Sequence, residues 1–95
     1  MSMTYFASQA DFSAVRTEAW RRIFGMMIQK TRQATGRSLE ESARLAGMES
    51  SEWAAVESGY IPADPSRLRS MAAALEIRFE QMATMVFICQ SAWKG

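Results

Sequence analysis

Apolar residues recur along the chain with the period of an α-helix, and the first long stretch runs from Ser13 to about Ala34. Val15, Ala19, Ile23, Met27 and Thr31 recur at helical spacing, with Phe24 and Ile28 as the alternative to Ile23 and Met27. Asp11 or Ser13 can cap this helix, and Gly36 follows its end, where a left-handed residue is favoured. Gly25 lies inside the run and indicates a break or a close contact.

Two short helices are predicted next, with a glycine between them. Ser38 begins the first, and Glu41 follows three residues later, which is the spacing of a capping box. Gly47 comes after this helix, and the second helix begins near Ser50 and stops at Ser58–Gly59. The pair spans about residues 38–58.

The last two predicted helices follow a turn-rich linker. Asp64 as N-cap and Pro65 at the first helical position begin one of them. Its apolar stripe consists of Leu68, Met71, Ala72 and Leu75. A fifth helix runs from about Phe79 to Ala92, and no β-alternation or internal repeat occurs. The pattern therefore predicts an all-α fold with an N-terminal arm over residues 1–12 and one domain over 13–95.

Composition limits the chemistry that the chain can carry. Ninety-five residues make one domain, and the hydrophobic share of 48% and charged share of 22% are ordinary globular values. The sequence has no histidine and one cysteine, Cys89, which excludes Cys–His nucleophile pairs and zinc sites. We therefore expect no catalytic residues, no metal and no cofactor, and no enzyme activity.

Net charge and hydropathy bear on the cellular compartment and give no indication of a binding partner. A net charge of +1 gives no general attraction to nucleic acid or membranes. The most apolar run, residues 82–89, is far shorter than the roughly 20 residues of a spanning helix. The N-terminus has no signal-peptide pattern, and Cys89 cannot form an intrachain disulfide. We expect a cytoplasmic protein without a membrane partner.

The short helices and their neighbours carry residues typical of one family. A small residue lets two helices approach, a glycine turns the chain and an apolar residue fills the corner, as a helix-turn-helix requires. Here the three are Ala43, Gly47 and Met48. The full set of residues typical of the family is Arg32, Gly36, Ser38-Leu39-Glu40-Glu41, Ala43, Gly47-Met48, Trp53, Val56-Glu57, Gly59, Pro65, Leu68, Ala72 and Leu75. On them, the stretch from Ile28 to about Val86 resembles the lambda-repressor-like, or XRE, helix-turn-helix family.

The resemblance implies a compact five-helix bundle whose third helix, about residues 50–58, enters the major groove of double-stranded DNA. It also implies an ion pair between Arg32 and Glu57, which would clamp the first helix to the end of the third. In such domains the start of the recognition helix meets base edges, while flanking segments hold phosphates. The base-reading candidates are Glu49, Ser50, Ser51 and Ala55. The phosphate candidates are Arg37, Ser58 and Arg67.

The same segment departs from the family pattern in charge and in one core position. From Ser38 to Glu57 there are five glutamates and one arginine, a local charge of −4 that repels phosphates. Leu39 stands where a phosphate-contacting glutamine is common in the family. Ser42 occupies a position usually filled by leucine, and we expect its hydroxyl to bond back to a helix carbonyl.

The fifth helix is apolar on two sides, although a surface helix needs only one apolar face. One stripe is Met82, Ala83, Val86, Phe87 and Gln90, and the other is Met85, Ile88, Cys89 and Trp93. A homodimer through Met85, Ile88 and Trp93 would cover the second stripe. The alternative is cover from the same chain, by Tyr5, Phe6, Phe12 and Trp20. We expect Cys89 to be an inert buried thiol.

Two functions therefore fit the sequence. The first is a DNA-binding transcription regulator, dimeric, that reads the major groove with the helix at residues 50–58. The second is a protein-interaction module on the same fold, in which the acidic helix or the apolar fifth helix contacts a protein. The family resemblance favours the first and the local charge favours the second.

Overall fold

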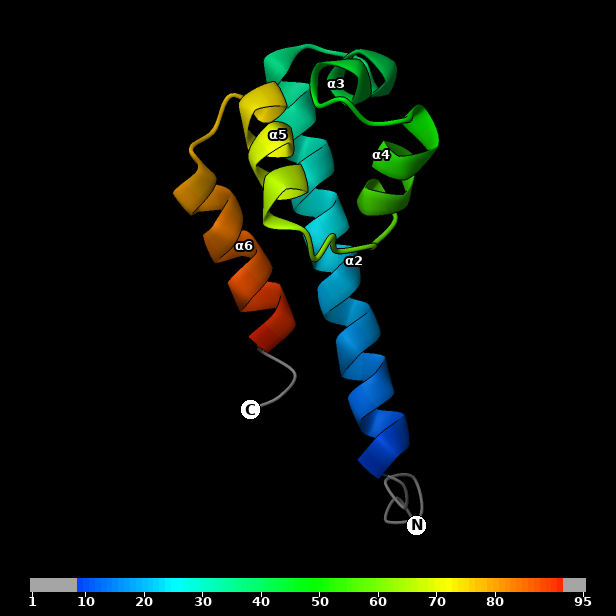
Figure 1. Cartoon of the computed structure of the whole chain (residues 1–95). Coiled ribbons are helices and arrows are strands. Elements are labelled where there is room, and N and C mark those ends of the chain that lie inside the picture. The colour runs from blue at the N-terminus through cyan, green and yellow to red at the C-terminus, as the bar shows by residue number, and fades with distance from the viewer. Residues whose placement is uncertain (1–8, 92–95) are drawn as a thin grey trace.

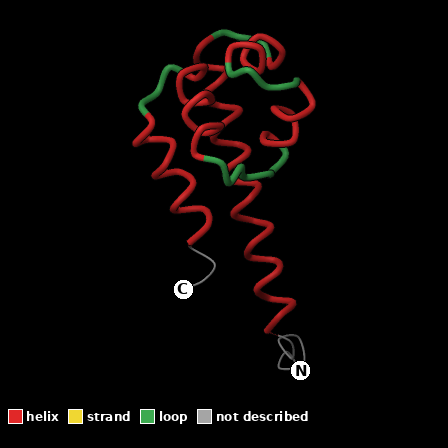
Figure 2. The backbone as a smooth tube through the Cα atoms, in the orientation of Figure 1, coloured by secondary structure: helices red, strands yellow, loops and turns green. Residues whose placement is uncertain are grey.

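The computed structural model describes residues 9–91 of the chain and has five α-helices and no strand in that range. They are α2 (Gln9–Thr35), α3 (Leu39–Leu45), α4 (Ser50–Glu57), α5 (Pro65–Leu75) and α6 (Phe79–Ser91). The helices α3, α4 and α5 gather around the C-terminal half of α2, and α6 runs antiparallel beside α2 (Figure 1). The connections are short, and the longest of them joins α4 to α5 (Figure 2). The predicted all-α, five-helix class is confirmed.

The long first helix begins earlier than the sequence pattern predicts. It starts at Gln9 and contains both Asp11 and Ser13, so neither residue caps it and residues 9–12 are not part of an arm. Gln9 and Ala10 are good helix formers, and a helix that has nucleated extends at little cost. Residues 1–8 of the predicted arm lie outside the described residues. The first turns of α2 extend past the end of α6 (Figure 1).

The hydrophobic core lies where α2, α3, α4 and α5 meet, and α6 closes it on one side. Its largest fully buried apolar side chains are Trp53, Phe24, Ile28, Met71, Leu75, Met82, Val56 and Cys89. Burying one large apolar side chain contributes roughly 1.5–3 kcal/mol, so this cluster is the main source of stability. The predicted apolar stripe of α5 is buried in it, as expected.

Gly25 marks the closest approach of α2 to α4. A Cβ atom on this residue would clash with the carbonyl oxygen of Glu57 and lie 3.0 Å from that of Val56. The helix α2 runs unbroken through this point. The glycine is therefore explained by a close contact between two backbones, not by a break in the helix.

Ser42 is the one polar side chain in the buried core of the described residues. Its Oγ has no hydrogen-bond partner there, so the predicted bond back to a helix carbonyl is wrong. A hydroxyl buried without a partner costs stability because it loses its hydrogen bonds to water. Serine in place of a larger apolar side chain thus weakens this part of the core.

Candidate nucleic-acid interface

The chain turns between α3 and α4 at a corner made by Ala43, Gly47 and Met48. Gly47 has a φ of +69°, in the left-handed region that glycine tolerates best. The Met48 N–H donates to the Ala43 carbonyl oxygen at 2.8 Å, and the side chains of both residues are buried. The corner predicted at residue 47 is confirmed.

Both helices of this pair begin at side-chain caps. The Ser38 hydroxyl accepts from the Glu41 N–H at 3.1 Å, and the Glu41 carboxylate accepts from the Ser38 N–H at 3.0 Å. The predicted capping box is therefore present, and the backbone hydrogen bond from Ser38 lowers the pKa of Glu41. At α4, the Glu52 carboxylate accepts from the Glu49 N–H at 3.0 Å. Two glutamates of the acidic segment thus serve to begin helices.

A buried ion pair between Arg32 and Glu57 joins α2 to the end of α4. Arg32 Nε donates to Glu57 Oε2 at 2.6 Å and Nη2 donates to Oε1 at 3.1 Å, with the two side chains 12% and 7% exposed. Trp53 Nε1 also donates to Glu57 Oε2, at 2.8 Å, and Arg32 Nη1 donates to the Arg37 carbonyl oxygen. The hydrogen bond to Glu57 raises the pKa of Arg32. We call these contacts the Arg32–Glu57 clasp.

The outer face of α4 is the side of this helix that points away from the core. It consists of Glu49, Ser50, Ser51, Ala55 and Ser58, all of them exposed. Trp53 and Val56 on the opposite side are buried, so the orientation of the helix is set by its packing. The face carries all four predicted base-reading residues. Its side chains are short apart from Glu49, so the backbone can come close to a partner.

A family model described as a helix-turn-helix domain matches residues 23–84, about two-thirds of the chain. That range contains the corner, both caps and the clasp. The chain belongs to the helix-turn-helix domain family. No curated protein and no solved structure matches it.

The two predicted phosphate-binding arginines of the helix-turn-helix domain already have partners inside it. Arg37 donates to the Ala74 carbonyl oxygen at 2.8 Å and pairs with Glu76 at 2.9 Å, so its guanidinium holds the C-terminal end of α5. Arg67 pairs with Glu52 at 3.5 Å, beside α4. Ser58 is exposed after the last residue of α4. Because the donors of Arg37 are used within the domain, Ser58 and Arg67 are the better placed phosphate candidates.

Two features of the domain were not predicted from the sequence: the Trp53–Glu57 hydrogen bond and the absence of an ion-pair partner for Arg44 among the described residues. The Trp53–Glu57 hydrogen bond joins residues four apart on one helix, a spacing that brings side chains together, so it could have been anticipated. Arg44 is exposed on α3 and has no ion pair closer than 4.0 Å among the described residues. It is a cation available on the helix-turn-helix itself.

A second exposed surface lies where α6 packs against α2. Ile23, Met26, Met27 and Met85 line a shallow, mostly apolar groove of about 340 Å³, whose lining also includes Lys30 and Thr31. Ile88 lies one turn beyond Met85. We call Ile23, Met26, Met27, Met85 and Ile88 the α2–α6 apolar face.

The assignment of the α6 residues to two apolar stripes is wrong, because the buried side of this helix takes residues from both stripes. Met82 and Cys89 are both buried, although they were placed in different stripes, and Phe87 of the first stripe is 69% exposed. A helix that is apolar nearly all round does not reveal from its sequence which side meets the core. Burial raises the pKa of the Cys89 thiol, so it is a poor nucleophile.

The residues proposed to cover α6 from the same chain are only partly described. Trp20 is half-buried and packs against the core. Tyr5, Phe6, the side chain of Phe12 and the dimer candidate Trp93 lie outside the described residues.

Two kinds of site are absent from residues 9–91. No helix in this range is long and apolar enough to span a membrane. The range contains no group of three or more His, Cys, Asp or Glu side chains that could hold a metal ion.

Proposed function

We propose that this chain is a DNA-binding transcription regulator that inserts the outer face of α4 into the major groove of double-stranded DNA. The observation that supports this most is the rigid mounting of α4 with its outer face exposed: the corner fixes one end and the Arg32–Glu57 clasp fixes the other. The Ser50 and Ser51 hydroxyls in the first turn can bond base edges, and Ala55 can contact a thymine methyl group.

The charge around α4 sets the expected strength of this binding. Arg32 neutralises Glu57 and Arg67 pairs with Glu52, which removes two of the five acidic charges. The other three glutamates, at positions 40, 41 and 49, have no ion pair among the described residues. They repel phosphates, so we expect one domain to bind weakly and two linked domains to be needed.

A homodimer through the α2–α6 apolar face would supply the second domain. Ile23, Met26 and Ile88 are 39%, 56% and 46% exposed, and burying such side chains contributes roughly 1.5–3 kcal/mol each when burial is complete. A two-fold dimer presents two α4 helices to the half-sites of a palindrome. A DNA-binding regulator has to share a compartment with its DNA, and we propose that this compartment is the cytoplasm.

Salt-dependent binding to a random-sequence duplex tests the proposal. Fluorescence anisotropy of a labelled duplex should show binding at low salt, and the logarithm of the affinity should fall linearly as the logarithm of the salt concentration rises. The slope should correspond to several phosphate contacts. No binding at the lowest salt would refute the DNA-binding function.

Substitutions on α3 and α4 separate charge effects from base recognition. Glu40→Gln, at an exposed position of α3, should raise affinity for all duplexes about threefold, because one charge that repels phosphates is removed. Glu80→Gln on α6 is the matched control and should change nothing. Ser50→Ala should alter which sequences are preferred in a selection from random duplexes. An unchanged preference would mean that Ser50 does not face the bases.

Light scattering tests the dimer. Met26→Glu and Ile88→Glu each place a charge on the α2–α6 apolar face and should convert a dimer into a monomer. Leu45→Glu is the control, since Leu45 is 51% exposed on α3 and lies outside this face. A monomeric parent protein, or equal effects of all three changes, would exclude this interface.

The acidic helix-turn-helix segment supports a second candidate function, a module that binds a basic protein segment. Glu40, Glu41 and Glu49 then attract the partner instead of weakening DNA binding. The same anisotropy experiment distinguishes the two functions with a labelled arginine-rich peptide in place of DNA. Binding to the peptide with no binding to DNA favours the second function.

A further inference from the structure

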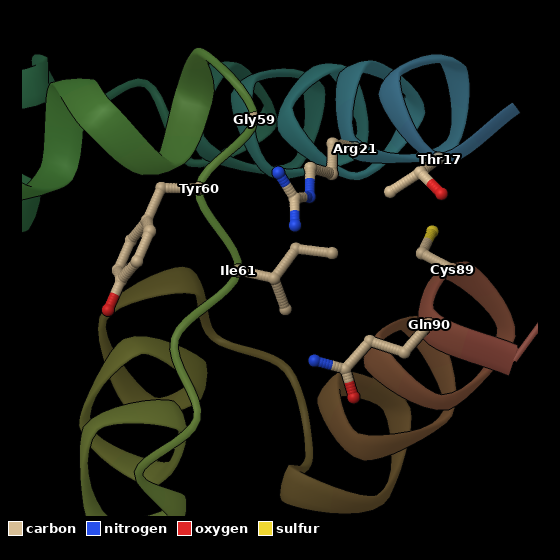
Figure 3. Close-up of a pocket in the computed structure, with 7 residues that line it drawn as sticks. All are labelled: Thr17, Arg21, Gly59, Tyr60, Ile61, Cys89 and Gln90. Atoms are coloured by element: carbon tan, nitrogen blue, oxygen red, sulfur yellow. The ribbon is translucent and has the colours of Figure 1, made fainter. Parts of the chain in front are cut away.

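A cavity of about 560 Å³ lies beside the loop that follows α4, between this loop and the helices α2 and α6 (Figure 3). It is bounded by the N-terminal half of α2, the chain at residues 59–61 and the end of α6. Its lining residues are Thr17, Arg21, Gly59, Tyr60, Ile61, Cys89 and Gln90. The volume is within the range of small-molecule sites in proteins. Three segments far apart in sequence thus form one concave site.

The lining of this cavity combines one cation with polar and apolar groups in about equal share, and its apolar part includes the Ile61 side chain. Arg21, Ile61 and Gln90 point toward one another across it, while the ring of Tyr60 points away (Figure 3). Arg21 makes no hydrogen bond or ion pair within the described part of the chain, and no lining residue is acidic. The cavity therefore carries a single positive charge with no internal counter-ion, next to the Ile61 side chain and the buried Cys89.

We propose that this cavity binds a small organic acid with one carboxylate and a compact apolar body. The planar guanidinium of Arg21 suits a carboxylate, because it can donate two parallel hydrogen bonds. The Gln90 amide supplies a further donor, and Ile61 contacts the apolar part. A phosphate dianion fits less well, because one arginine leaves half of its charge uncompensated in a partly enclosed site.

The position of the cavity links it to the end of α4. Gly59 passes so close to α2 that a Cβ atom there would lie 3.4 Å from the Arg21 backbone. The N–H groups of Gly59 and Tyr60 donate to the Val56 and Ala55 carbonyl oxygens of α4, at 3.0 and 2.9 Å. A ligand between Arg21 and Ile61 therefore contacts the segment that ends the recognition helix. We infer that the acid is an effector of DNA binding, a step that rests on the proposed function.

Binding of benzoate to the intact chain, without DNA, tests the site. In amide-resolved NMR, benzoate should produce saturable shifts at Gly59, Ile61, Cys89 and Gln90, with millimolar affinity, as expected for so small a ligand. Arg21→Gln should weaken this binding at least about tenfold, since it removes a charge-assisted contact. Arg22→Gln is the matched control: Arg22 does not line the cavity and pairs with Glu18, so affinity should stay within about twofold.

Four results with the intact chain would overturn the organic-acid site. They are the absence of saturable shifts at these amides, equal binding of the neutral isostere benzamide, unchanged benzoate affinity in Arg21→Gln, and tighter binding of inorganic phosphate at the same amides. Benzoate binding that occurs only after removal of residues 92–95 would assign the cavity to the chain's own C-terminus and would also overturn it.

The effector role has a separate readout. Saturating benzoate should change the affinity for random duplex at least about fivefold in the parent protein and not in Arg21→Gln. If benzoate binds but duplex affinity stays the same, the site stands and the effector role fails. A failure of DNA binding itself leaves the benzoate experiment unaffected, so the two proposals fail independently.

Discussion

The helix-turn-helix region and the α2–α6 region of this domain are built differently. In the first, α3, α4 and α5 each begin at a capping side chain, and Arg32 and Glu57 satisfy one another in a buried pair. In the second, the apolar side chains of Ile23, Met26 and Ile88 remain partly in contact with water. The α2 helix belongs to both, since its C-terminal half lies in the core and only its first turns extend past α6 (Figure 1).

This difference indicates where each region finds its partners. The polar groups that set the geometry of α4 bond to each other, so contacts within the domain itself hold this helix in position. On the α2–α6 apolar face, Met27 and Met85 are partly buried against the core, while Ile23, Met26 and Ile88 stay in contact with water among the described residues. The first region is thus suited to rigid recognition, and the second to association with another surface.

The largest expected effect comes from breaking the Arg32–Glu57 clasp. Glu57→Ala leaves Arg32 without a counter-ion and Trp53 Nε1 without its acceptor, so the free energy of unfolding should fall by about 3–5 kcal/mol. Urea denaturation measures this. Arg22→Ala breaks the Glu18–Arg22 pair, whose side chains are 66% and 71% exposed, and should cost less than about 1 kcal/mol. Equal losses in the two variants would contradict the distinction between the regions.

A smaller effect is expected at the contact between α2 and α4. Gly25→Ala should destabilise the domain by about 1–3 kcal/mol, because the new methyl group clashes with the Glu57 carbonyl. In an ordinary helix the same change stabilises by up to about 1 kcal/mol. Ala19→Gly, at an exposed position of the same helix, should cost no more than about 1 kcal/mol. An increase in melting temperature for Gly25→Ala would show that the two backbones are not in close contact.

The smallest expected effect on stability is at Ser42, whose buried hydroxyl has no hydrogen-bond partner in the described part of the chain. Ser42→Ala removes a buried hydroxyl that lacks a partner and should raise the free energy of unfolding by about 1 kcal/mol. Ser70→Ala is the control, since the Ser70 hydroxyl donates to the Ser66 carbonyl oxygen at an exposed position, and its effect should stay within about 0.5 kcal/mol. Loss of stability in Ser42→Ala would mean that the hydroxyl has a partner in solution.

The parts of the fold that were predictable depend on neighbours in the chain. The capping box at Ser38, the cap at Asp64 and the turn at Gly47 each involve groups within five residues of one another. The partners of Arg37 are the Ala74 carbonyl and Glu76, nearly forty residues away, and nothing in the local sequence indicates them. The buried side of α6 was missed for another reason, because apolar residues occupy most of its circumference.

Mapping a DNA duplex onto the protein by amide-resolved NMR tests the central claim most directly. At low salt, shifts caused by a random-sequence duplex should concentrate at Ser50, Ser51 and Ala55 and leave residues 23–27 and 85–88 unchanged. Shifts that fall on the α2–α6 apolar face, or that are absent from α4, would contradict recognition of DNA by this helix.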